Sequence, residues 1–126
     1  MLRDAISTCE FDVCIGNGYA YYIKTFFTND GTVRYYNNDM YPIDMHSVSQ
    51  AVFTLLKVGG TPKDLDLCTK IIGRAIDLLY QPSKDQFAYQ KTRWLTNRIN
   101  YTRWTQAWAY YSLAFYNRYR KEMNDA

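Results

Sequence analysis

Two aspartates and the single histidine of the chain lie close together in the sequence, at Asp39, Asp44 and His46. A pair of carboxylates can supply the general acid and general base that hydrolyse a glycosidic bond. The histidine can transfer a proton or polarise a sugar hydroxyl. Together with a tyrosine it can also remove the α-proton of a uronate, as a lyase or epimerase does. These three residues are our candidate catalytic group.

Each of the three also has a structural interpretation. Asp44 precedes the helix expected from Met45, and because aspartate is a strong capping residue we favour an N-cap role for it. Asp39 stands in an Asn-Asn-Asp turn, where solvation explains it equally well. His46 could brace the loop through hydrogen bonds. A lone histidine does not make a metal site, so we expect neither a metal nor a cofactor.

A second group of residues is suited to binding a sugar. Pyranose C–H faces pack on aromatic rings, and arginine, lysine and asparagine donate hydrogen bonds to hydroxyls or carboxylates. The candidate substrate-binding residues are Tyr36, Tyr41, Tyr89, Lys91, Arg93, Trp94, Asn97, Tyr101, Arg103 and Trp104. Trp104 and Trp108 are four residues apart on one helical face, so for these two we favour a place in the core or at an interface.

The spacing of apolar residues predicts the elements that carry both groups. We expect helices over residues 2–27 (with a break at Gly16-Asn17-Gly18), 45–59, 62–80 and from about 102–105 to 121. The apolar face of the helix expected over 62–80 includes Ile76. Residues 30–44 are expected to form a long loop, and residues 86–100 a short β-hairpin-like excursion. Gly59-Gly60 and Thr61-Pro62 signal a tight turn between two helices.

That tight turn makes the helices over 45–59 and 62–80 antiparallel. If the last helix points the same way as the helix over 45–59, then the loop at 28–44 and the segment at 81–103 lie at one end. Both segments lead into helix N-termini, which favour anionic or oxygen-rich ligands. We therefore expect the two groups of candidate residues to meet there.

Composition restricts the class of protein. The 126 residues, 48% hydrophobic and 21% charged, predict a single globular domain over 1–126. The charge of +3 is spread along the chain, so nucleic acid is not expected as a partner. Three cysteines without a C-x-x-C pair argue against disulfides. No apolar run approaches the roughly 18 residues of a membrane span, and we expect a cytoplasmic protein.

Three motifs resemble a known family. They are Asp30-Gly31-Thr32 with Tyr35-Tyr36-Asn37 and Tyr41-Pro42-Ile43-Asp44-Met45-His46-Ser47, then Phe87-Ala88-Tyr89-Gln90-Lys91 with Arg93-Trp94-Leu95-Thr96-Asn97-Arg98, and Tyr101-Thr102-Arg103-Trp104-Thr105-Gln106-Ala107-Trp108. In this order, over roughly residues 18–118, they resemble a bacterial family linked to polysaccharide biosynthesis, whose members are similar to six-hairpin (α/α) toroid glycosidases. Some members carry the label delta-aminolevulinic acid dehydratase.

The resemblance implies an all-α fold of antiparallel helix pairs forming part of an (α/α) toroid. Delta-aminolevulinic acid dehydratase is an (α/β) barrel with Schiff-base lysines. This sequence does not show alternating strands and helices, so that activity is not expected. A whole toroid has more helix pairs than this chain, which implies either a missing N-terminal part or a homo-oligomer. We expect a carbohydrate-related protein of polysaccharide biosynthesis or processing, with an oligosaccharide or polysaccharide as ligand. The alternatives are a non-catalytic carbohydrate-binding or assembly module, an inactive remnant that self-associates, and a uronate lyase or epimerase.

Overall fold

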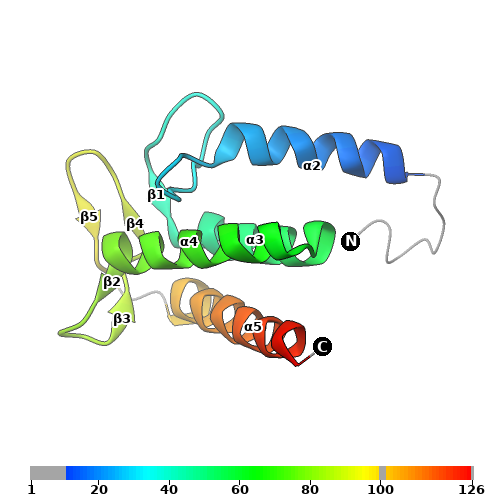
Figure 1. Cartoon of the computed structure of the whole chain (residues 1–126). Helices are drawn as coiled ribbons and strands as arrows, with labels where there is room; N and C mark the ends of the chain where they lie inside the picture. Colours follow the sequence, from blue (N-terminus) through cyan, green and yellow to red (C-terminus); the bar gives the residue numbers. More distant parts are fainter. Residues whose placement is uncertain (1–10, 100–101, 126) are drawn as a thin grey trace.

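The computed structural model of the chain describes residues 11–99 and 102–125. This part is mostly helical, with α2 (Asp12–Phe26), α3 (Met45–Thr54), α4 (Pro62–Leu79) and α5 (Ala107–Asn124). Two π-helical turns, η1 (Leu55–Gly59) and η2 (Thr102–Gln106), continue α3 and precede α5. In Figure 1, α2 and α4 run toward the small strands, and α3 and α5 run away from them. Within this part no helix combines the length and apolarity needed to cross a membrane.

Helix α3 lies at the centre because it packs against both α4 and α5. It is buried on most of its circumference, and the buried side chains include Met45, Val48 and Val52. Toward α5 the contact is made by small residues. The Ser112 hydroxyl of α5 donates a hydrogen bond to the Ser49 hydroxyl of α3 at 3.3 Å, and both side chains are buried. The two helices therefore approach closely.

The turn between α3 and α4 has the geometry that the sequence predicts. Gly60 has a φ of +68°, which favours glycine, and its N–H donates to the Leu55 carbonyl at 3.0 Å. Thr61 and Asp64 form a capping box at the start of α4, with Pro62 at the first helical position. A methyl group on Gly59 would collide with the Asp64 side chain and with a tyrosine hydroxyl of α2, so α2 is held closely at this turn.

Among residues 11–99 and 102–125, five two-residue strands lie at one end of the helices (Figure 1). Strands β1 (Ile43–Asp44), β4 (Gln90–Lys91) and β5 (Thr96–Asn97) form an antiparallel sheet in the order β1-β4-β5, and β2 (Tyr80–Gln81) pairs with β3 (Gln86–Phe87). In the first sheet, Asp44 is paired with Gln90. The end of the long loop thus lies beside the later excursion, as we predicted, and the expected hairpin is β4–β5. The β2–β3 hairpin was not predicted.

The long loop is fixed where it leaves α2. The Asp30 carboxylate accepts hydrogen bonds from the Thr28 hydroxyl and from the Thr32 backbone N–H and hydroxyl, and these bonds lower the pKa of Asp30 to about 2. Arg74 of α4 lies 3.3 Å from the same carboxylate. Gly31 supplies the positive φ of +87° that the turn requires. The Asp-Gly-Thr motif therefore anchors the loop to α4.

Two expectations about the helices were wrong. Helix α2 continues through Gly16-Asn17-Gly18 without a break. Each glycine costs a helix about 1 kcal/mol, but packing of Tyr19 and Ile23 against the core holds α2 in place. The stretch of the predicted helix over residues 2–10 lies outside the described residues. Ile76 is exposed rather than buried, because the buried stripe of α4 follows positions 68, 71, 72, 75 and 79.

Candidate functional site

The Asp44 carboxylate is almost fully buried, with 3% of the residue exposed, and it is hydrogen-bonded on both oxygens. Oδ1 accepts from the backbone N–H groups of His46 and Ser47 at 2.7 and 3.4 Å. Oδ2 accepts from the Gln90 side-chain amide at 3.2 Å. The two bonds to Oδ1 confirm the N-cap interpretation, because they satisfy N–H groups that the first turn of α3 leaves without a partner.

The same carboxylate orients the histidine. His46 Nδ1 lies 3.3 Å from Asp44 Oδ1, and the ring packs edge-on against Tyr89 with centroids 5.8 Å apart. The Tyr89 carbonyl also accepts from the Met45 N–H at 3.2 Å, so this contact is tied to the start of α3. The Asp44 carboxylate therefore contacts the imidazole ring at Nδ1.

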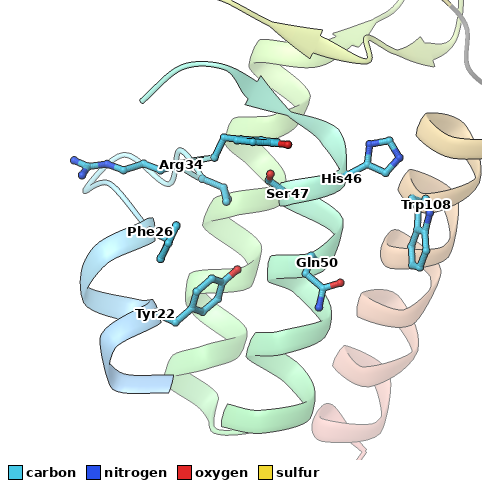
Figure 2. A pocket seen from close by; sticks show the side chains of 9 residues that line it. Tyr22, Phe26, Arg34, His46, Ser47, Gln50 and Trp108 are labelled. Carbon is cyan, nitrogen blue, oxygen red and sulfur yellow. The ribbon is translucent and has the colours of Figure 1, made fainter. Parts of the chain in front are cut away.

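A hollow of about 420 Å³ opens beside His46. Its lining comes from α2, the start of the long loop, α3 and α5, and consists of Tyr22, Phe26, Val33, Arg34, Tyr35, His46, Ser47, Gln50 and Trp108. Figure 2 shows His46 and Gln50 of α3 on the side of Trp108, with Tyr22 and Phe26 across from them. Burial raises the pKa of Tyr22 to about 12, so its hydroxyl stays protonated and can donate a hydrogen bond.

Two further hollows adjoin the first along α5. One, of about 280 Å³, is lined by Gln50, Phe53, Thr54, Lys57, Trp108 and Tyr111. The other, of about 330 Å³, is lined by Arg103, Ala107, Trp108 and Tyr111. Because Trp108 lines all three, we refer to the three hollows together as the Trp108 groove.

Two aromatic rings are held in position in this groove. The Trp108 and Tyr111 rings pack against Phe53 of α3 at centroid distances of 6.2 and 4.9 Å. Phe53 itself is buried, whereas Trp108 and Tyr111 remain 42% and 55% exposed. Each ring is therefore supported on one side by the core and offers ring surface to the groove.

The predicted catalytic residues are only partly brought together. Asp44 and His46 are in contact, but Asp39 lies exposed in the loop, where its carboxylate accepts from the Tyr41 N–H at 3.1 Å. Of these three residues, only His46 lines the groove. The Asp44 carboxylate is occupied by the cap and by Gln90, which makes it a positioning group for the histidine.

The predicted binding residues on the loop and the hairpin lie outside the groove. The Arg93 guanidinium is 5.9 Å from the centroid of the Tyr41 ring, so these two residues pair across the two segments. Lys91 is half-buried in β4, opposite Ile43 of β1. Trp94 is 86% exposed at the tip of the hairpin.

The other predicted binding residues serve different purposes. Tyr36 packs edge-on against its exposed neighbour Tyr35, with centroids 4.8 Å apart. Asn97 pairs with Gln90 across β4–β5, and its carbonyl accepts from the Tyr89 N–H at 3.0 Å. Tyr101 lies outside the described residues.

The predictions for the residues at the start of the last helix have different outcomes. Arg103 lines the groove, as a substrate-binding residue would. We expected Trp104 and Trp108 in the core or at an interface; both are exposed, so the core position was wrong and the interface position stays a prediction. The groove residues that sequence reasoning missed include Tyr22, Gln50, Lys57, Trp108 and Tyr111. The available signal was the series of aromatic residues Trp104, Trp108 and Tyr111 along one helix, of which we had assigned Trp104 and Trp108 to the core or to an interface.

No three His, Cys, Asp or Glu side chains in the described ranges gather as a metal site would require. Comparison of the chain with family models, with curated proteins and with solved structures gives no match.

Proposed function

We propose that this chain is a carbohydrate-binding protein that holds an oligosaccharide in the Trp108 groove. The observation that carries the proposal is the pair of supported, half-exposed rings of Trp108 and Tyr111 in a depression that also contains the Gln50 amide. The C–H faces of pyranoses pack on such rings, while amides and hydroxyls bind the sugar hydroxyls. Ser47 and Tyr22 contribute hydroxyl groups in the adjoining hollow.

The resemblance to toroids of polysaccharide biosynthesis is part of this proposal. In a toroid of helix pairs, one layer of helices runs in one direction and the other layer runs back. Two observations support such an arrangement. Helices α3 and α5 run in one direction, and helices α2 and α4 run in the opposite direction (Figure 1). In that arrangement the Trp108 groove lies along α3 and α5, with α2 and the start of the long loop lining the hollow beside His46.

We propose binding rather than hydrolysis for the residues in hand. Glycoside hydrolysis needs two carboxylates on opposite sides of the scissile bond. Asp44 is buried in a cap, and Asp39 is bonded to the loop backbone outside the groove. A uronate lyase or epimerase is the second candidate function. It is favoured by one observation, the contact through which Asp44 orients His46 at the edge of the groove.

Self-association through α5 is the competing explanation of the same surface. Trp104, Trp108, Tyr110 and Tyr111 are all exposed on η2 and α5. Exposed aromatic side chains gathered in one region are typical of interfaces. An inactive remnant that dimerises would cover this surface with a second copy. If the groove binds a ligand, Trp108→Ala lowers the ligand affinity. If the groove is a dimer interface, the same substitution changes the oligomeric state.

The experiment is a binding titration of neutral and acidic oligosaccharides with the wild-type chain and matched variants. Trp108→Ala should lower the affinity about tenfold or more, because loss of a stacked ring costs on the order of 1.5 kcal/mol. Trp94→Ala, an exposed tryptophan outside the groove, is the matched control. Tyr111→Ala should likewise weaken binding, whereas Tyr110→Ala, one residue away and 77% exposed, should not.

Circular dichroism should show that all four variants keep the wild-type helix content. Equal effects of Trp108→Ala and Trp94→Ala would contradict the assignment of the groove. Binding lost only in Trp94→Ala would move the site to the hairpin, where the sequence alone had placed it.

A further inference from the structure

The charged side chains that line the Trp108 groove are of one sign. Arg34, Lys57 and Arg103 line it, together with His46. No Asp or Glu among residues 11–99 and 102–125 lines any of the three hollows. The chain as a whole has 15 Lys and Arg against 12 Asp and Glu, so its nearly balanced charge does not account for a groove without carboxylates.

Two of these cations stand at opposite ends of the aromatic pair. Arg103 lines the hollow at the strand end of α5, next to Trp108 and Tyr111. Lys57 lines the other hollow, and its ammonium lies 5.8 Å from the centroid of the Phe115 ring. From position 103 to position 115 the chain advances about three helical turns. The guanidinium of Arg34, by contrast, points away from His46 and Trp108 (Figure 2).

We infer that the ligand of the groove is an anionic oligosaccharide, one whose sugar rings lie on Trp108 and Tyr111 and whose acidic groups pair with Lys57 and Arg103. This inference rests on the proposed function and names its substrate class. Lysine and arginine bind carboxylates and sulfates through charge-assisted hydrogen bonds. A lining without carboxylates does not repel such a ligand. The aromatic rings bind sugar faces, which a small inorganic anion does not have.

The same charges disfavour a second copy of the chain as the occupant. In a two-fold dimer the same patch lies on both sides of the interface. Lys57 and Arg103 would then face a patch that carries only cations, and like charges across an interface oppose association. A ligand that carries negative charge removes this conflict.

The test uses tetramers of galacturonate and of mannuronate and the methyl esters of the same tetramers, titrated by calorimetry into the full chain. Methyl esters keep the sugar rings and remove the charge. At about 0.05 M salt at least one acid should bind about fivefold more tightly than its ester, and the difference should shrink at about 0.5 M salt, where the charges are screened.

The variants separate the charges from the rings. Lys57→Gln and Arg103→Gln should each lower the affinity for the acid about threefold to tenfold and leave that for the ester within about twofold. Lys63→Gln, an exposed lysine on the first turn of α4 outside the groove, is the matched control. Trp108→Ala should weaken the acid and the ester alike.

Two results would overturn the inference in different ways. If acid and ester bind equally and Trp108→Ala weakens both, the groove binds sugar without selecting charge, so the inference fails and the proposed function stands. If none of the four tetramers binds, the inference fails. If the neutral oligosaccharides do not bind either, the proposed function fails with it, and a dimer that Trp108→Ala converts to monomer in size-exclusion chromatography would identify the groove as an interface between copies.

Discussion

Replacement of Asp44 by alanine tests whether this residue is structural. The change removes the side chain that accepts the N–H groups of His46 and Ser47, and loss of a helix N-cap costs about 0.5–2 kcal/mol. It also leaves the half-buried Gln90 amide without this acceptor, which adds about 1 kcal/mol. We therefore expect the free energy of unfolding to fall by about 1.5–3 kcal/mol, or roughly 5–12 °C in the melting temperature at this chain length.

Urea unfolding followed by circular dichroism measures this loss. Asp39→Ala is the matched control, since its exposed carboxylate accepts one backbone hydrogen bond and its removal should cost less than about 0.5 kcal/mol. Asp44→Asn should lower the free energy of unfolding less than Asp44→Ala does, because asparagine caps a helix as well as aspartate does. The reasoning is refuted if Asp44→Ala is no more destabilising than Asp39→Ala. A catalytic role without a structural one would give that outcome.

Three further predictions concern stability and reactivity. Hydrogen bonds from threonine hydroxyls lower the pKa of Asp30 to about 2, so its contribution to stability is present above pH of about 4 and is lost as the pH falls toward 2. Asp30→Asn should flatten the decline of the unfolding free energy over that interval in urea titrations, and an unchanged decline would contradict this. Burial raises the pKa of the Cys68 thiol to about 12, so a thiol reagent at neutral pH should modify exposed Cys14 and spare Cys68 until the protein unfolds, as peptide mass mapping will show. Gly59→Ala should destabilise the fold by about 1–3 kcal/mol through steric collision, whereas Gly18→Ala, with open space around it, should stabilise α2 by about 0.5–1 kcal/mol; thermal unfolding of both variants checks the opposite signs.

The elements whose signals are local could be predicted from the sequence. Asp44 before Met45 and Thr61-Pro62 after Gly60 predicted where α3 and α4 begin, because capping depends on a few neighbouring residues. The break in α2 at Gly16-Asn17-Gly18 was predicted wrongly for the opposite reason. Whether a helix survives two glycines depends on tertiary packing, here that of Tyr19 and Ile23, which local propensity does not contain.

The candidate site was less accessible to sequence reasoning. The meeting of β1 and β4 followed from the directions of the helices, and this correctly placed His46 near Tyr89. The Trp108 groove could not be predicted from the helix directions, because it depends on which face of α5 other elements leave uncovered. A tryptophan at Trp108 gives the same helical pattern whether a neighbouring helix covers it or solvent does.

The small residues between α3 and α5 explain why that face stays open. Helix α5 buries Ala109 and Ser112 against α3, and these are small side chains that a hydrophobicity pattern does not select as a core face. The large rings of Trp108 and Tyr111 are left at the margin of the contact, where Phe53 supports them. A helix of this kind buries its small residues and displays its aromatic ones. Trp108, which the sequence alone assigns to the core or to an interface, is then one of the residues most apt to bind a ligand.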